Sequence, residues 1–383
     1  MAGSIYTALA SFTRGVLKGA EPDDPVNGLA KAKQTEEHRQ VGESDAAGDN
    51  IPLPDEPKGW RKLAEGSFPK SEAVARRHIE QICAWNRAAD LRGAGNMLHH
   101  CLLISDAHNR LSQPNTVPTR FLYELLQNAD DNKYGNKKPI LRITYTDDAN
   151  GNTLRIDTNE IGFSAEDIQA ICSIAQGQKL SDPSRIGEKG LGFKSVFGLS
   201  SSVWISSGRY SFKLVSEKMK KLGSVTPVWE KFPQPTLPQH TSILLRLYPE
   251  PMSNSRELVS MLKSLESALL FLRKLKEVEI TILEKDVEPW KTTLKRRIKP
   301  LGKDISMHEI LKDGVQHLTY HVFRQEVTEL GHDERRSGRD TSDLLLAFAT
   351  GEPKPENLYT FLPVRDFGLQ VCPIFFRTGI RIN

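Results

Sequence analysis

The stretch FLYELLQNADD, residues 121–131, has the spacing of an amphipathic helix with one polar and one apolar stripe side by side. The polar stripe stands at i, i+4 and i+7, on one face of a helix: Glu124, Asn128 and Asp131. The apolar stripe can seat the helix on a sheet: Leu122, Leu125 and Ala129. Pro118 is favoured in a first helical turn, so we expect the helix to begin there.

A carboxylate one turn before an amide offers two functions that ATP hydrolysis needs. Asn128 carries a hard oxygen suited to Mg²⁺, which keeps several waters and bridges substrate phosphates. Glu124 can orient and deprotonate an attacking water. The same spacing, taken alone, is more often an ordinary solvated helical face.

The residues around this helix predict strands and further helices. Residues 140–146 and 153–158 alternate apolar and polar side chains, and the Asn150-Gly151 step between them favours a tight hairpin. A helix from Ser71 is expected before this region. After it the sequence predicts helices at 165–174 and 257–275 and strands at 203–206, 210–214, 242–247 and 278–283. The order of elements indicates an α+β sandwich for residues 115–250.

A glycine-rich segment, GEKGLGF at residues 187–193, has the GxxGxG spacing. Glycines let a backbone approach a phosphate closely, and the following helix N-terminus attracts anions. The spacing is not that of a Walker A loop, and no strand leads directly into it as in a Rossmann fold. A flexible turn before a helix is the alternative interpretation.

A third motif, IDTNEIGF at residues 156–163, ends a strand and opens a helix. A carboxylate here can accept the exocyclic amine of adenine, while Gly162 leaves room for the ring. Specificity follows because a buried acceptor left unpaired costs about 1–3 kcal/mol. The alternative is an Asx turn that caps the next helix.

Together, in this order and at these intervals, the three motifs resemble the GHKL superfamily of DNA gyrase, the ninety-kilodalton heat-shock chaperone, histidine kinases and MutL. Within it, FLYELLQNADDN, NEIGFSAEDIQAICSI and IGEKGLGFKSVF are similar to the sacsin and NO VEIN group, including its fungal members. The resemblance covers about residues 79–367. It implies a Bergerat-type α/β sandwich, a mixed, mainly antiparallel sheet covered by helices, followed by a second, smaller and truncated α/β domain.

The resemblance also implies roles for individual residues. Glu124 matches the water-activating acid, Asn128 the magnesium ligand and Asp131 the later acid of that helix. Thr241 matches a threonine that reaches the adenine-binding acid. The phosphate side, with residues 176–186 as a lid, comprises Lys179, Gly187, Lys189, Gly190, Leu191, Gly192 and Phe193, and Lys194 is a further cation for the phosphates.

The function implied is ATP binding with slow, Mg²⁺-dependent hydrolysis, in which lid closure serves a chaperone-like or regulatory role with protein clients or partners. Relatives often dimerise through this domain, so a homodimer is one expectation. The alternatives are a non-catalytic nucleotide-sensing interaction module and a histidine kinase. No separate helix with a phosphoacceptor histidine is evident, which disfavours the kinase.

The sequence departs from the superfamily at three places. Counting back from Gly162 places Thr158 where the adenine-binding aspartate belongs, so Asp157, Asn159 or Glu160 must replace it, and the NO VEIN-like pattern favours the last two. Gly177-Gln178-Lys179 stands where relatives carry Ser-Thr-Lys. The ending VCPIFFRTGIRIN does not match the segment that supplies an arginine to the γ-phosphate, which leaves Arg365, Arg377 and Arg381 as fallback candidates.

The composition of the chain argues against some other classes of protein. The 383 residues carry 52 basic and 48 acidic side chains, a balance that does not favour nucleic acid binding. No apolar run approaches the ~20 residues that cross a bilayer, so no membrane association is expected. The four cysteines are far apart, which fits a reducing compartment, cytoplasmic or nuclear, although the first twenty residues weakly resemble a mitochondrial presequence. The expected organisation is a disordered region at 1–57, leading helices at 58–115, an ATP-binding domain at 116–250 and an incomplete second domain at 251–383.

Overall fold

The computed structural model describes residues 67–90, 117–147, 149, 151–172, 193–216, 222–249, 255–270, 272–327, 342–350, 357–360, 362–366 and 374–377. All of them belong to one compact unit, Leu53–Asn383. The predictions for residues 1–57, for the part of the leading helices between residues 91 and 115, for the lid and for the glycine-rich turn up to Gly192 lie outside the described residues.

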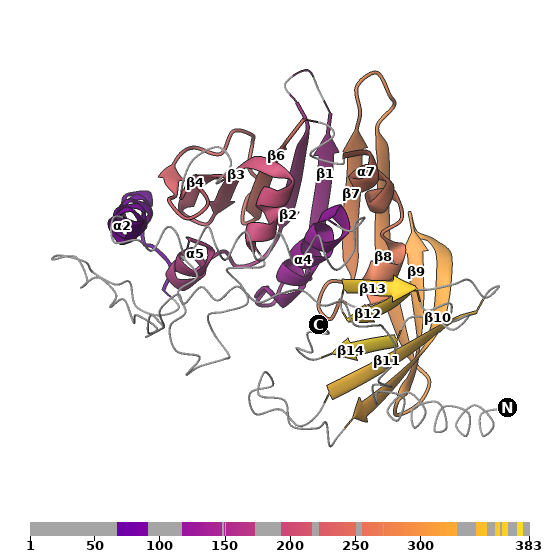
Figure 1. Cartoon of the computed structure of the whole chain (residues 1–383). Helices are drawn as coiled ribbons and strands as arrows, with labels where there is room; N and C mark the ends of the chain where they lie inside the picture. Colours follow the sequence, from indigo (N-terminus) through magenta and orange to yellow (C-terminus); the bar gives the residue numbers. More distant parts are fainter. Residues whose placement is uncertain are drawn as a thin grey trace, which may run out of the picture. The chain divides into compact units, whose positions relative to one another are not determined.

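The described part has an α+β architecture in which the strands form one mixed sheet (Figure 1). The strand order is β13-β12-β14-β11-β10-β9-β8-β7-β1-β2-β6-β3-β4-β5. The strands are β1 Leu141–Thr146, β2 Thr153–Thr158, β3 Ser200–Ser207, β4 Tyr210–Val215, β5 Val228–Trp229, β6 Thr241–Leu247, β7 Glu277–Leu283, β8 Trp290–Pro300, β9 Ile305–Lys312, β10 Val315–Val327, β11 Ser342–Ala349, β12 Asn357–Thr360, β13 Leu362–Asp366 and β14 Ile374–Arg377. The helices are α2 Glu72–Asp90, α4 Val117–Asp131, α5 Ala165–Cys172 and α7 Ser255–Lys263, with 3-10 turns η1 Ser195–Gly198 and η2 Glu266–Leu270.

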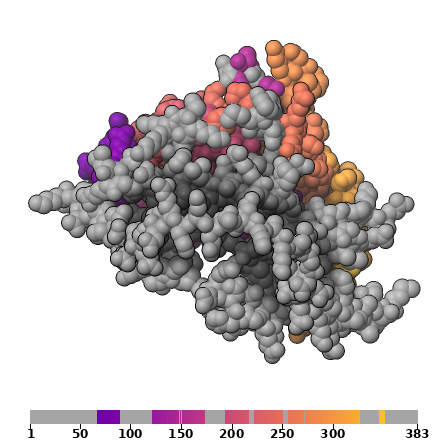
Figure 2. All heavy atoms as spheres, in the orientation of Figure 1, coloured from indigo at the N-terminus to yellow at the C-terminus, as the bar shows by residue number. Residues whose placement is uncertain are grey.

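The β1–β2 hairpin confirms the prediction from its alternating pattern. The two strands pair antiparallel from Leu141↔Thr158 to Thr146↔Thr153. Gly151 lies in the connection between the strands, residues 147–152, and has a φ of +97°, which an L side chain rarely adopts. The ends of this hairpin and of β7–β8 are exposed at the upper edge of the view in Figure 2.

Helix α4 confirms the amphipathic pattern of residues 121–131. It begins at Val117, one residue before Pro118. The predicted apolar stripe is buried: Leu122 is 0%, Leu125 7% and Ala129 3% exposed. Figure 1 shows α4 in front of the strands β1 and β2.

The sheet continues beyond residue 250, because β7 pairs in parallel with β1. The C-terminal end of α4 fixes the start of β7. The Asp130 carboxylate accepts backbone N–H groups from Arg273 (2.7 Å), Lys274 (2.7 Å) and Leu275 (2.9 Å). The division into domains at residue 250 stays a prediction.

The predicted helix at 257–275 is wrong in its length. Helix α7 ends at Lys263, and a separate turn, η2, covers Glu266–Leu270. The Ser264 hydroxyl donates to the carbonyl of Ser260 (3.1 Å). Such bonds from a serine side chain compete with helical continuation, and the sequence pattern of apolar residues did not reveal the break.

A buried histidine links α2 to the sheet. His78 is 2% exposed, and its Nδ1 lies 2.9 Å from the Tyr210 hydroxyl. Burial lowers the pKa of His78 to about 4. The folded protein therefore keeps this imidazole neutral at pH values near 6.5, at which an exposed histidine begins to protonate.

We expect this group to make the protein less stable in mild acid. The pKa of His78 in the folded protein lies below its value of about 6.5 in the unfolded chain. Between these two pH values the unfolded chain binds one more proton than the folded protein. The stability that is present above pH 6.5 is therefore lost as the pH falls towards 4. The loss from this one group is about 1–3 kcal/mol. Denaturant unfolding at pH 7 and pH 4.5 should show a smaller pH difference in His78→Gln, which can keep a hydrogen bond to Tyr210. An unchanged pH difference would contradict the assignment.

None of the helices in the described ranges combines the length and the apolar character that a bilayer crossing demands.

Candidate functional site

A pocket lies between α4, β2, α5 and β6, with about 750 Å³ of empty space that includes a part open to solvent. Its lining combines apolar with polar side chains: Leu125, Asn128, Ala129, Asp131, Asn132, Ile156, Thr158, Glu160, Phe163, Asp167, Ala170, Ile171, Phe193, Thr241 and Ile243.

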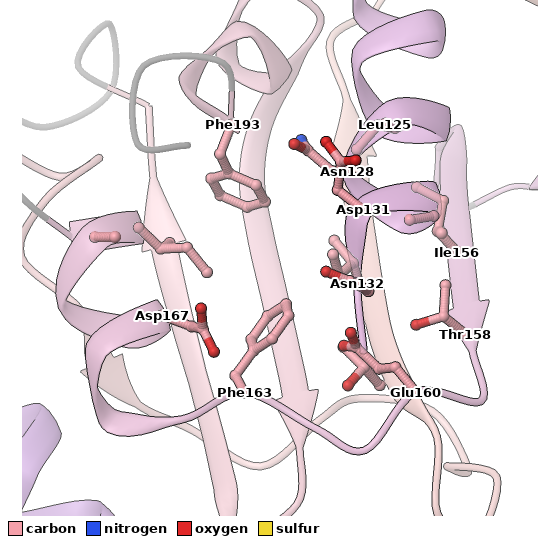
Figure 3. A pocket seen from close by; sticks show the side chains of 15 residues that line it. Leu125, Asn128, Asp131, Asn132, Ile156, Thr158, Glu160, Phe163, Asp167 and Phe193 are labelled. Atoms are coloured by element: carbon pink, nitrogen blue, oxygen red, sulfur yellow. The ribbon is translucent and has the colours of Figure 1, made fainter. Parts of the chain in front are cut away.

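The polar groups are divided between the two ends of the pocket (Figure 3). Asn128 and Asp131 of α4 lie near Phe193 at one end. Thr158 and Glu160 lie at the other end, and Asn132 lies between the two groups in this view. Each end carries one carboxylate, Asp131 at the first and Glu160 at the second, and a neutral polar side chain beside it, Asn128 and Thr158.

Of the three candidates for the adenine contact, only Glu160 lines the pocket. Asp157 is buried and accepts hydrogen bonds from Arg155 Nε (2.8 Å) and from the Ser242 hydroxyl (2.5 Å). Asn159 accepts the N–H of Ile140 (2.9 Å) through Oδ1 and donates to the carbonyl of Lys138 (2.8 Å) through Nδ2. Both side chains are thus engaged in joining strands and loops.

Strand alternation explains why Asp157 lies outside the pocket. Successive side chains of a strand point to opposite faces, so Ile156 and Thr158 face the pocket and Asp157 faces away from it. Thr158 was singled out only because it occupies the position of the superfamily aspartate. The period-two pattern of β2 was the signal that could have identified it as a lining residue.

Glycine is needed at position 162, where the chain passes close to the β3–β4 turn. Its φ is +101°, and an added Cβ would lie 3.4 Å from the Ser207 hydroxyl. That hydroxyl accepts the N–H of Phe163 (2.8 Å) and lies 2.7 Å from Thr241 Oγ1. Thr241 stands opposite Thr158 in the β2–β6 pairing. These contacts fix the wall of the pocket next to Glu160.

The three residues of the α4 polar stripe are not equivalent. Asn128 and Asp131 line the pocket, whereas Glu124 is half-buried on α4 and is not among the lining residues. Asp131 also forms an ion pair with Arg273 at the C-terminal end of the helix. The side chain of Asn128 therefore lines the pocket, whereas that of Glu124 does not.

Phe193 is the residue of the glycine-rich motif that the structure places, and it lines the pocket. It directly follows Gly192 in the chain. The next residue, Lys194, is buried and donates to the carbonyls of Ile171 (3.0 Å) and Ser224 (3.2 Å), so its ammonium is used in packing α5. The remaining predicted residues lie outside the described part: Lys179, Gly187, Lys189, Gly190, Leu191 and Gly192.

Every ionisable group among the described lining residues is an acid: Asp131, Glu160 and Asp167. Asp167 was missed in the sequence, although Ser164 followed by an acid three residues later is a capping signal. Its Oδ2 accepts the N–H of Ser164 (2.9 Å), and the Ser164 hydroxyl accepts the N–H of Asp167 (3.3 Å). Within the described ranges, no group of three or more His, Cys, Asp or Glu side chains is arranged to hold a metal ion.

Most residues that line this pocket lie in a segment that matches a known protein family. Residues 111–225 match the family model of the sacsin domain, and all the lining residues except Thr241 and Ile243 fall within that range. A stretch of 111 residues is 40% identical to Protein NO VEIN of Arabidopsis thaliana, and it covers 28% of this chain and 4% of that protein. The chain therefore carries a sacsin-like segment, and a stretch of the chain is similar to a small part of Protein NO VEIN.

Proposed function

We propose that the chain binds ATP in this pocket and hydrolyses it slowly in the presence of Mg²⁺, with a Bergerat-type arrangement of α4, α5 and the central strands. The observation that carries the proposal is the division of polar groups in Figure 3, with Glu160 at one end and Asn128 beside Phe193 at the other. Adenine would lie at the first end and the phosphates at the second.

The adenine end supplies an acceptor in an apolar setting. Glu160 is 4% exposed, and Thr158 and Thr241 lie on neighbouring positions of β2 and β6. A buried carboxylate accepts the exocyclic amine of adenine, while Phe163 and Ile243 offer apolar contact to the ring. Guanine carries a carbonyl at the corresponding position and would be repelled.

The phosphate end needs positive charge from outside the described wall, because the described lining residues there carry none. Asn128 would hold Mg²⁺ together with water and phosphate oxygens, and the ion would neutralise phosphate charge. Lys179 and Lys189 of the lid and the glycine-rich motif are the further cations that the proposal assigns to this end. Among the described residues, the proposal assigns the positioning of the triphosphate to Asn128, through its side-chain amide.

Replacement of Glu160 by Gln tests the adenine assignment. We expect wild-type protein to prefer ATP over GTP, and Glu160→Gln to lose at least about tenfold of that preference, because an unmatched buried polar contact costs about 1–3 kcal/mol. The measurement is competition of ATP and GTP against a fluorescent ATP analogue. Glu166→Gln on α5 is the matched control, since Glu166 does not line the pocket. Equal preference in all three proteins would remove Glu160 from the site.

A non-catalytic nucleotide sensor is the second candidate. It is favoured by the position of Glu124, which is not among the lining residues, and by the ion pair that engages Asp131 with Arg273. This candidate predicts thermal stabilisation by ATP without phosphate release. In either case we propose that the nucleotide controls contacts with protein clients or partners, a second copy of the chain included.

A further inference from the structure

A second concave surface lies at the C-terminal end of α4, on the side of the segment that leads into β7. It has about 950 Å³ of empty space, open solvent included. Six of its ten lining residues are Lys or Arg and none is Asp or Glu: Asn132, Lys133, Tyr134, Gly135, Lys137, Lys138, Pro139, Arg273, Lys274 and Lys276. We call this surface the basic groove.

The fold itself holds these cations together. They come from two segments, 133–138 and 273–276, that are far apart in the chain. The three N–H bonds to the Asp130 carboxylate fix the second segment against the end of α4. Like charges repel at this spacing, so the cluster exists because a buried anchor imposes it and not because the side chains attract one another.

Part of the positive charge is already used within the protein. Arg273 forms an ion pair with Asp131, and Lys138 forms one with Glu277 (2.6 Å). Lys274 Nζ donates to the carbonyls of Asp131 (2.9 Å) and Asn132 (2.8 Å), and Lys137 Nζ donates to those of Glu160 and Gln239 (3.4 Å each). Lys133 and Lys276 are exposed, and neither takes part in an ion pair within the described residues. These two ammonium groups therefore remain available to an anion.

We propose that the basic groove binds a compact ligand carrying several phosphate groups. Lysine is a point-charge donor suited to phosphate oxygens, and a ligand with more than one phosphate offers a partner to each of the available ammonium groups, those of Lys133 and Lys276. The source is either a free polyphosphorylated molecule or the headgroup of a polyphosphorylated lipid. The inference stands independently of the ATP pocket, with which the groove shares only Asn132.

Other polyanions fit the groove less well. Tyr134 is its single aromatic residue, is 5% exposed and donates its hydroxyl to the carbonyl of Ala129 (2.7 Å), so it offers no face on which a base can stack. An acidic peptide normally adds apolar anchors to its charges. Apart from Pro139 the groove presents no aliphatic side chain for such an anchor.

The test is calorimetric titration of the full chain with inorganic tripolyphosphate and with inositol hexakisphosphate at low and high salt. We expect binding that weakens with salt and that falls about tenfold or more in the double variant Lys133→Glu/Lys276→Glu. Lys299→Glu/Lys303→Glu changes the net charge equally at exposed positions outside the groove and should bind like the wild type. Thermal unfolding of both double variants checks that they fold.

Three results would overturn the proposal: the absence of binding to both probes, an equal loss in the two double variants, or a loss caused by Asn128→Ala, which would place the polyphosphate at the phosphate end of the ATP pocket. Failure of ATP binding alone leaves the groove result unaffected. Flotation with phosphatidylcholine vesicles, with and without phosphatidylinositol bisphosphate, separates the sources. Vesicle binding that requires the phosphoinositide and both groove lysines supports the lipid headgroup, and binding of the free probes without vesicle binding supports a soluble ligand.

Discussion

Replacement of Asp130 by Ala is expected to lower the free energy of unfolding by about 3–5 kcal/mol, the largest stability effect that we predict. The carboxylate is 2% exposed and accepts three backbone N–H groups at 2.7–2.9 Å. Removing it leaves those donors unsatisfied near the start of β7. The measurement is equilibrium unfolding in denaturant.

The neighbouring acid provides a matched control. Asp131 has a side chain that is 32% exposed, and it pairs with Arg273, whose side chain is 50% exposed. Ion pairs in such positions contribute about 0–1 kcal/mol, so Asp131→Ala should change stability little. Similar losses in the two variants would show that the three N–H bonds do not anchor β7. Asp130→Asn should fall between them, because its amide oxygen can still accept but carries no charge.

The ATPase proposal takes Glu124 as the general base from the resemblance alone, and it therefore expects Glu124→Ala to reduce phosphate release by about 10²–10⁴-fold, the usual contribution of such a base. ATP affinity should stay close to that of the wild type, since Glu124 does not line the pocket. The assay is single-turnover phosphate release together with a binding titration. Glu80→Ala is the control, because Glu80 lies in an exposed ion pair with Arg76 on α2.

The same experiment separates the two candidate functions. Phosphate release that is lost in Glu124→Ala and kept in Glu80→Ala supports the ATPase. ATP binding with no release from the wild type supports the nucleotide sensor and removes the catalytic role of Glu124. Release that persists in Glu124→Ala at the wild-type rate assigns the base to another residue.

Local patterns predicted the elements that surround the pocket. The amphipathic spacing in residues 121–131 and the Asn150-Gly151 step are interactions between near neighbours in the chain, and the structure has α4 and the β1–β2 hairpin at these places. The presence of Asn128, Asp131, Glu160, Phe193 and Thr241 around one cavity was expected from a resemblance and not from local spacing.

Contacts between residues far apart in the chain could not be predicted from sequence patterns. Asp130 was overlooked beside the polar stripe because its partners lie more than 140 positions later in the chain. Asp157 was retained as an adenine candidate because its bond with Ser242 depends on the pairing of β2 with β6. The Arg273 ion pair with Asp131 likewise depends on how α4 meets the start of β7.

The most direct measurement of the central claim is calorimetric titration of ATP, with and without Mg²⁺, into the wild type and Asn128→Ala. The account predicts that the wild type binds more tightly when Mg²⁺ is present and that Asn128→Ala loses this gain while retaining its fold. No ATP binding by the folded wild type, or the same affinity for Mg-ATP in both proteins, would contradict the assignment of this pocket.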